Sequence, residues 1–162
     1  MNLLLYLDTN ILISLYESAD ETHDALWSFV NLSVGRDDIE FHTSALSFSE
    51  LLAKPYRERD RRLARQYLTL AKSEGWLTVW DVSPRVIELA AVIRSVLRMK
   101  LPDAIHFSTA VVGQSSHILT ADAGFIAHGD LEHPISGKSL SISVSTLRPD
   151  PASISELVKA LS

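Results

Sequence analysis

A short apolar run near the start of the chain, LLLYL at residues 3–7, constrains the fold more than any other feature of the sequence. A run of this length without charges predicts a strand that is buried on both faces. The run stops at Asp8, and residues 9–17 then show the spacing of a helix. The sequence thus places a carboxylate at the point where a buried strand ends and a helix begins.

Predicted strands and helices alternate along the whole chain. The later apolar patterns predict strands at 39–44, 76–82, 117–122 and 139–147. Helical spacing is found at 9–17, 21–34, 44–54, 57–75, 83–99, 101–113 and 153–162. Pro55 is expected to stop one helix and Gly75 to close the next. Residues 123–133 are expected to form a loop or a short helix, and 129–141 are the loosest stretch. This alternation predicts an α/β fold with a mostly parallel sheet covered on both faces.

The composition is that of a globular protein with one domain. The chain has 162 residues, of which 46% are apolar and 22% charged, enough for a full core. The absence of cysteine excludes disulfides, thiolate zinc sites and cysteine nucleophiles. Without a signal peptide or a stretch long enough to span a bilayer, a cytoplasmic protein with no membrane association is expected. We assign residues 1–148 to the domain and 149–162 to an extension that either forms a short helix or frays.

Four acidic residues occupy positions that a parallel sheet would bring to one edge. Asp8 and Asp122 follow predicted strands, and the carboxyl ends of parallel strands meet at the same edge. Glu50 and Asp103 lie in helices that can bring them there. Taken alone, each has another interpretation: Asp8 as a helix cap, Asp103 as a partner of the helix dipole, Asp122 as a turn residue, and Glu50 as a solvated acid. Their joint occurrence favours one shared site.

Such a cluster of carboxylates favours a bound cation. Two carboxylates about 4 Å apart repel each other by roughly 4 kcal/mol at an effective dielectric of about 20. Because the chain has no thiolates, the cation is expected to be hard, Mg²⁺ or Mn²⁺ rather than Zn²⁺. Water activated by such an ion can attack a phosphodiester. The net charge of −5 argues against a protein coated in nucleic acid, but not against an enzyme that holds it through metal ions.

Four segments, taken in order, resemble the PIN-domain nucleases, and most of all the VapC-type toxins of toxin–antitoxin pairs. They are LDTNILISL, SELLAKP, LPDAIHFSTA and ILTADAGF, and the resemblance covers roughly residues 3–147. It implies a three-layer α/β/α sandwich around a parallel sheet. It also implies an endoribonuclease that depends on Mg²⁺ or Mn²⁺ and cleaves RNA.

The resemblance also implies roles for individual residues and partners. The acidic quartet that matches the family's catalytic residues is Asp8, Glu50, Asp103 and Asp122. The expected metal ligands are Asp8, Asp103 and Asp122, while Glu50 would orient a water molecule or a second ion. Residues at positions that support the acids by hydrogen bonds are Thr9, Asn10 and Thr120. The expected partners are an RNA substrate, an antitoxin protein and a second copy of the chain.

Two other functions remain open for a chain of this kind. The first is a nuclease of the same fold that acts in RNA processing or DNA repair without being a toxin. The second is a non-catalytic binding module that keeps the fold, which is disfavoured because all four acids are present.

Two further features have competing interpretations. His106 lies one helical turn after Asp103 and is either its hydrogen-bond partner or a partly buried structural histidine. The arginine-rich segment RERDRRLAR at residues 57–65 is either a solvated helix face with ion pairs or a patch that positions phosphates. Lys54, one turn after Glu50, is expected to pair with that acid or to contact RNA.

Overall fold

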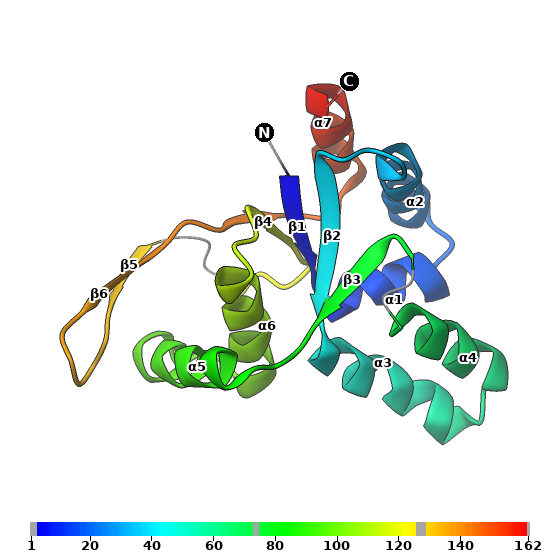
Figure 1. The fold of residues 1–162 in the computed structure, drawn as a ribbon. Coiled ribbons are helices and arrows are strands. Elements are labelled where there is room, and N and C mark those ends of the chain that lie inside the picture. Colours follow the sequence, from blue (N-terminus) through cyan, green and yellow to red (C-terminus); the bar gives the residue numbers. More distant parts are fainter. Residues whose placement is uncertain (1–2, 73–74, 126–128, 162) are drawn as a thin grey trace.

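Five strands form one parallel sheet at the centre of the protein. The computed structural model describes residues 3–72, 75–125 and 129–161. The order across the sheet is β3-β2-β1-β4-β7, and every neighbouring pair is parallel (Figure 1). The strands are β1 (Leu3–Leu7), β2 (Ile39–Ser44), β3 (Leu77–Trp80), β4 (His117–Leu119) and β7 (Ser145–Leu147). The prediction of a parallel sheet within an α/β fold is confirmed.

Helices cover both faces of this sheet (Figure 1). They are α1 (Thr9–Glu17), α2 (Glu21–Ser33), α3 (Ala45–Glu58), α4 (Arg61–Leu70), α5 (Pro84–Leu97), α6 (Leu101–Val112) and α7 (Pro151–Leu161). Side chains of β1 alternate between two hydrophobic clusters: Leu5 and Leu7 pack on the side of α1 and α2, whereas Tyr6 packs on the side of α5 and α6. The first strand is therefore buried on both faces, as its apolar run predicts, and the expected α/β/α layers are confirmed.

The prediction that Pro55 stops a helix is wrong. Helix α3 continues to Glu58 and ends at Arg59, which has a left-handed conformation with φ 58°. Proline removes one helical hydrogen bond because it has no N–H. Pro55 nevertheless lies buried on the inner face of α3, and its carbonyl oxygen accepts hydrogen bonds from the backbone of Arg59 and Asp60.

The single helix predicted at 57–75 is also too long. Asp60 caps a separate helix, α4, by accepting from the backbone N–H groups of Arg62 and Leu63. This helix ends at Leu70, and residues 73 and 74 of the predicted helix lie outside the described part of the chain.

The single late strand predicted at 139–147 is two strands. Its first part, β6 (Ser139–Ile142), pairs antiparallel with β5 (Gly129–Glu132), and its second part is β7 of the main sheet. The predicted loop at 123–133 therefore contains a strand, while residues 126–128 lie outside the described residues. Figure 1 shows this hairpin projecting beside α5. Alternation within one segment does not reveal that its two halves pair with different partners.

The extension after residue 148 contains helix α7, which packs against α2. Ile154 is 1% exposed and belongs to the same hydrophobic cluster as Leu5 and Leu7. A domain boundary at residue 148 remains a prediction. Within the described residues, no helix is both long and apolar enough to cross a bilayer.

We predict that Ile154→Ala lowers the free energy of unfolding by about 2–5 kcal/mol, because truncating a buried isoleucine leaves a cavity. Urea unfolding would measure the change. Ile135→Ala is the matched control, because Ile135 is 90% exposed and its truncation should change stability by no more than about 0.5 kcal/mol. An Ile154→Ala protein as stable as the wild type would contradict the packing of α7 on the core.

Candidate active site

The candidate site lies at the edge of the sheet where the parallel strands end. Helices α1 and α3 leave β1 and β2 at this edge (Figure 1). Asp8 follows the last residue of β1, and Thr120 follows the last residue of the neighbouring strand β4. The two strands are adjacent and parallel, so the residues that follow them lie side by side.

Asp8 is a nearly buried carboxylate, 6% exposed, that also caps α1. One of its oxygens, Oδ1, accepts a hydrogen bond of 2.7 Å from the backbone N–H of Thr9. The other, Oδ2, accepts from Asn10 Nδ2 at 2.7 Å and from Thr120 Oγ1 at 2.6 Å. A buried carboxylate is tolerated when donors satisfy it. The capping role and the candidate ligand role therefore belong to the same side chain.

The hydrogen bonds around Asp8 extend to the loop that carries Asp122. Thr120 Oγ1 accepts from the backbone N–H of Asp122 at 3.0 Å, and Asn10 Oδ1 accepts from that of Ala121 at 3.0 Å. On the other side of this loop, Arg148 Nη1 donates to the carbonyl oxygen of Asp122 at 2.5 Å. The backbone at Asp122 is thus held relative to Asp8.

Asp103 lies in the first turn of α6 and is partly buried. Its pKa is raised above the ordinary value by burial first, and then by repulsion from the carboxylates of Asp122 and Asp8. Asp103 and Asp122 both line a cleft of about 290 Å³, together with Lys100. The structure therefore brings three of the predicted acids close enough to influence one another electrostatically.

The arrangement of these acids limits how they could hold an ion. Among the residues that the structure describes, no three acidic or histidine side chains lie close enough together to hold one metal ion. Mg²⁺ in proteins commonly keeps several waters and uses one or two carboxylates. The donor set consists of carboxylate oxygens that repel one another, and it fits a hard divalent cation bound partly through water.

Glu50, on α3, is the fourth acid and is held by two donors. Its Oε2 accepts hydrogen bonds from Thr9 Oγ1 and, at 2.9 Å, from His106 Nε2. Burial raises the pKa of Glu50, but the hydrogen bonds from His106 and Thr9 outweigh burial, so the pKa lies below its ordinary value. Glu50 is therefore ionised at neutral pH.

His106 contacts Glu50 rather than Asp103. It is 2% exposed, and its Nδ1 lies 2.7 Å from the hydroxyl of Tyr6. Of the two interpretations, the hydrogen bond to Asp103 is not the one that the structure forms: His106 is a buried histidine whose partners lie on β1 and α3. Sequence reasoning also missed Tyr6 and Arg148. The only signal for Tyr6 is a hydroxyl within an otherwise aliphatic buried run, and nothing local singles out Arg148.

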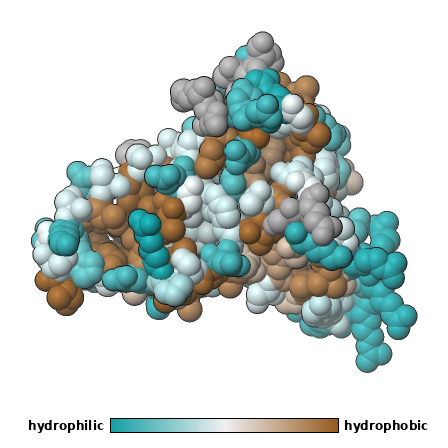
Figure 2. Space-filling model, viewed as in Figure 1, coloured by the Kyte–Doolittle hydropathy of each residue, from teal (hydrophilic) through white to brown (hydrophobic). Residues whose placement is uncertain are grey.

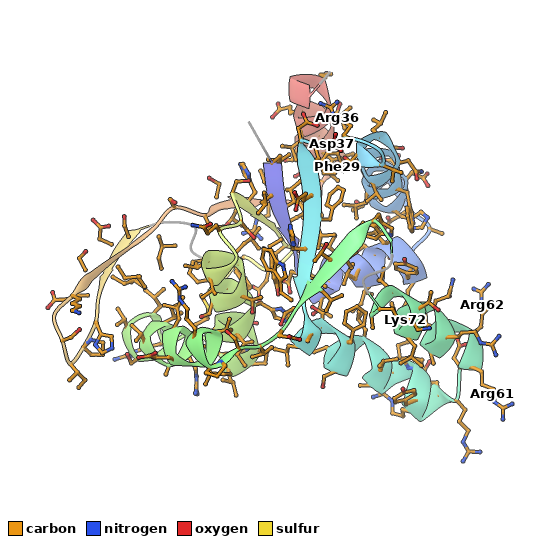
Figure 3. The ribbon with its side chains drawn as sticks, viewed as in Figure 1. Phe29, Arg36, Asp37, Arg61, Arg62 and Lys72 are labelled. Carbon is orange, nitrogen blue, oxygen red and sulfur yellow. The ribbon has the colours of Figure 1, made fainter. Side chains whose placement is uncertain are left out.

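The arginine-rich segment lies at the far end of α3 and the start of α4. Figure 3 shows Arg61 and Arg62 pointing away from the protein, and Figure 2 shows hydrophilic side chains projecting there. Within the described residues, the one ion pair inside this segment joins Arg57 to Glu58 at 3.9 Å. The charged side chains of this segment are exposed, so the structure agrees with a solvated face but forms one ion pair among the described residues rather than several. Lys54 pairs with Glu17 at 2.5 Å, not with Glu50.

Comparisons with known proteins agree with this fold. The model of the PIN domain family matches residues 5–131. A search of curated proteins finds no significant match.

Three solved structures share the fold. A VapBC2 complex from Rickettsia felis, bound to a promoter DNA fragment, gives a TM-score of 0.60 at 16% identity, covering 74% of this chain and 88% of that one. A toxin–antitoxin complex from Klebsiella pneumoniae gives a TM-score of 0.59 at 18% identity, covering 90% of this chain and 98% of that one. VapC20 from Mycobacterium tuberculosis, a sarcin-ricin loop cleaving toxin, gives a TM-score of 0.54 at 18% identity, covering 70% of this chain and 86% of that one. Because the family model matches residues 5–131, which is most of this chain, the chain belongs to the PIN domain family.

Proposed function

We propose that this protein is an endoribonuclease that depends on Mg²⁺ or Mn²⁺ and acts as the toxin of a toxin–antitoxin pair. The observation that carries the proposal is the cluster of mutually repelling carboxylates at the carboxyl edge of the sheet. Burial raises the pKa of Asp103, and repulsion from Asp122 and Asp8 raises it further. Retaining such a cluster destabilises a folded protein unless a cation binds there.

Each acid has a distinct task in this proposal. Asp8, Asp103 and Asp122 hold the cation, directly or through water, and Glu50 orients the attacking water. A bound divalent cation would neutralise charge that develops on the phosphate and favour ionisation of water. Thr120 and Asn10 keep Asp8 in place by donating to its Oδ2, and Thr9 does the same for Glu50. The expected result is hydrolysis of a phosphodiester bond.

The proposed partners rest on the structural neighbours. Two of them are toxin–antitoxin complexes, and one is a sarcin-ricin loop cleaving toxin. By analogy of fold, we propose an RNA substrate, an antitoxin protein and a homodimer for this chain.

We predict that Asp8→Asn lowers the rate of metal-dependent RNA cleavage at least about 100-fold, the upper end of what loss of a supporting partner costs. Asparagine keeps the size of the side chain but removes the charge that holds the cation. Cleavage of a fluorescent single-stranded RNA at millimolar Mg²⁺ or Mn²⁺ measures the effect. Asp37→Asn is the control, because Asp37 is exposed and lies far from this edge (Figure 3). Equal rates for Asp8→Asn and wild type would refute the role of Asp8.

A second prediction concerns the stability of the metal-free protein. The folded-state pKa of Asp103 is raised above its ordinary 3.8, so the folded protein binds this proton more strongly than the unfolded chain does. At pH values above the folded-state pKa of Asp103, the ionised side chain therefore lowers the free energy of unfolding. This loss of stability disappears as the pH falls towards 3.8. Asp103→Asn should raise the melting temperature at pH 7, and the gain should shrink as the pH approaches about 4.

The same variant should lose its response to metal. Metal that binds the folded state alone stabilises wild type by about 2.7 kcal/mol at one hundred times Kd. Asp103→Asn should show a much smaller shift in melting temperature, whereas Asp37→Asn should behave as wild type. If metal raised the melting temperature of Asp103→Asn as much as that of wild type, the assignment of Asp103 as a ligand would be contradicted.

Toxin function has its own test. Expression in a bacterial host should arrest growth, and co-expression of the product of the neighbouring reading frame should restore it. Asp8→Asn should not arrest growth at equal protein levels. Arrest by Asp8→Asn, or the absence of arrest by an RNA-cleaving wild type, would contradict the toxin assignment and favour a nuclease with another role.

A further inference from the structure

A chain of buried polar groups lies behind Glu50 and links it to the central strand. Tyr6 on β1 is fully buried, and its hydroxyl lies 2.7 Å from Nδ1 of His106 on α6. The other ring nitrogen, Nε2, lies 2.9 Å from Oε2 of Glu50 and 3.3 Å from Oγ1 of Thr9. Four different elements thus contribute one polar side chain each to a continuous network.

The chemistry of the groups sets the direction of these hydrogen bonds. Glu50 is ionised and can accept but not donate, so Nε2 of His106 carries the proton that points to it. On the other side of the ring, Nδ1 lies 2.7 Å from the buried hydroxyl of Tyr6, which can donate to it. When Tyr6 donates to Nδ1, the ring proton lies on Nε2 and faces Glu50.

The two donors to Glu50 meet the same oxygen. Thr9 Oγ1 and His106 Nε2 both bind Oε2, whereas Oε1 makes no hydrogen bond within the described residues. The side chain of Glu50 is 34% exposed, so it remains accessible to solvent. One oxygen is anchored, and the other is free for a ligand.

A second buried histidine in the same protein is held differently. His42 is also buried, at 4% exposed, and stacks on Trp80 with ring centroids 3.9 Å apart. Its Nε2 lies 3.3 Å from Glu40, but neither ring nitrogen makes a hydrogen bond. By contrast, both ring nitrogens of His106 are engaged.

We propose that His106, oriented by Tyr6, is a positioning residue that anchors Oε2 of Glu50 and thereby presents Oε1 to the attacking water. This inference rests on the proposed nuclease function, and it assigns to Tyr6 and His106 a task that acts through Glu50. Partners of this kind typically change activity 10- to 100-fold when they are removed.

The first test compares three substitutions by steady-state kinetics on RNA. His106→Leu should lower kcat about 10- to 100-fold with little change in KM, because Glu50 is not expected to bind RNA directly. His106→Gln should recover most of this loss, since its amide N–H can reach the position of Nε2. Tyr6→Phe keeps the ring and should lower kcat about fivefold, the worth of one neutral hydrogen bond. His42→Gln is the matched buried control and should leave kcat unchanged.

The second test reads the network without any activity. Nitrogen NMR of the metal-free protein, labelled at histidine, should show His106 as the Nε2–H form. Both Tyr6→Phe and Glu50→Gln should shift the ring-nitrogen signals of His106, whereas Asp37→Asn should not. A wild-type Nδ1–H form, unchanged signals in Tyr6→Phe, or full kcat in a folded His106→Leu would overturn the proposal.

These outcomes are distinguishable from failure of the proposed function. A wild type that cleaves no RNA, or an Asp8→Asn variant as active as wild type, would refute the nuclease mechanism. The NMR signals would then still decide whether His106 anchors Glu50. Loss of kcat in His106→Gln equal to that in His106→Leu would indicate a packing role and refute positioning by the Nε2 donor.

Discussion

The hydrogen bonds that Asp8 accepts at the end of β1 are the interaction on which the rest of the candidate site depends. Thr120 and Asn10 donate to the same oxygen of Asp8, and they also accept from the backbone N–H groups of Asp122 and Ala121, respectively. A carboxylate that is 6% exposed is tolerated in the fold because these donors satisfy it. The sheet thus brings strands β1 and β4 together, and the polar groups at their ends set where the acids lie.

Much of the fold follows from the sequence because its local patterns agree with its tertiary contacts. The uncharged run at 3–7 predicts a central strand, and the helical spacing at 83–99 predicts α5, which begins with Ser83 as its cap and Pro84 in its first turn. The failures occur where tertiary contacts override local rules. Burial of Pro55 allows α3 to continue, and the segment 139–147 divides because its two halves pair with different strands.

Asp8 and Asp122 could be proposed from the sequence because parallel strands deliver the residues that follow them to one edge. The family resemblance added Thr9, Asn10 and Thr120, which donate to Glu50 and Asp8. Other contacts of the site could not be foreseen. Helical spacing leaves His106 as either a partner of Asp103 or a buried histidine, and the packing of α6 directs it to Glu50 on α3. Tyr6 lies 100 positions from His106, and Arg148 reaches the loop at Asp122 from beyond β7. Contacts of this range depend on the whole fold, and no local pattern encodes them.

Crystals soaked in Mn²⁺ would test the central claim, that these carboxylates hold a divalent cation. Anomalous scattering locates Mn²⁺ without any assumption about activity. The account predicts an anomalous peak at the carboxyl edge of the sheet, next to Asp103 and Asp122 and close to Asp8, that disappears in crystals of Asp103→Asn. A peak elsewhere, or no peak at this edge at millimolar Mn²⁺, would contradict it.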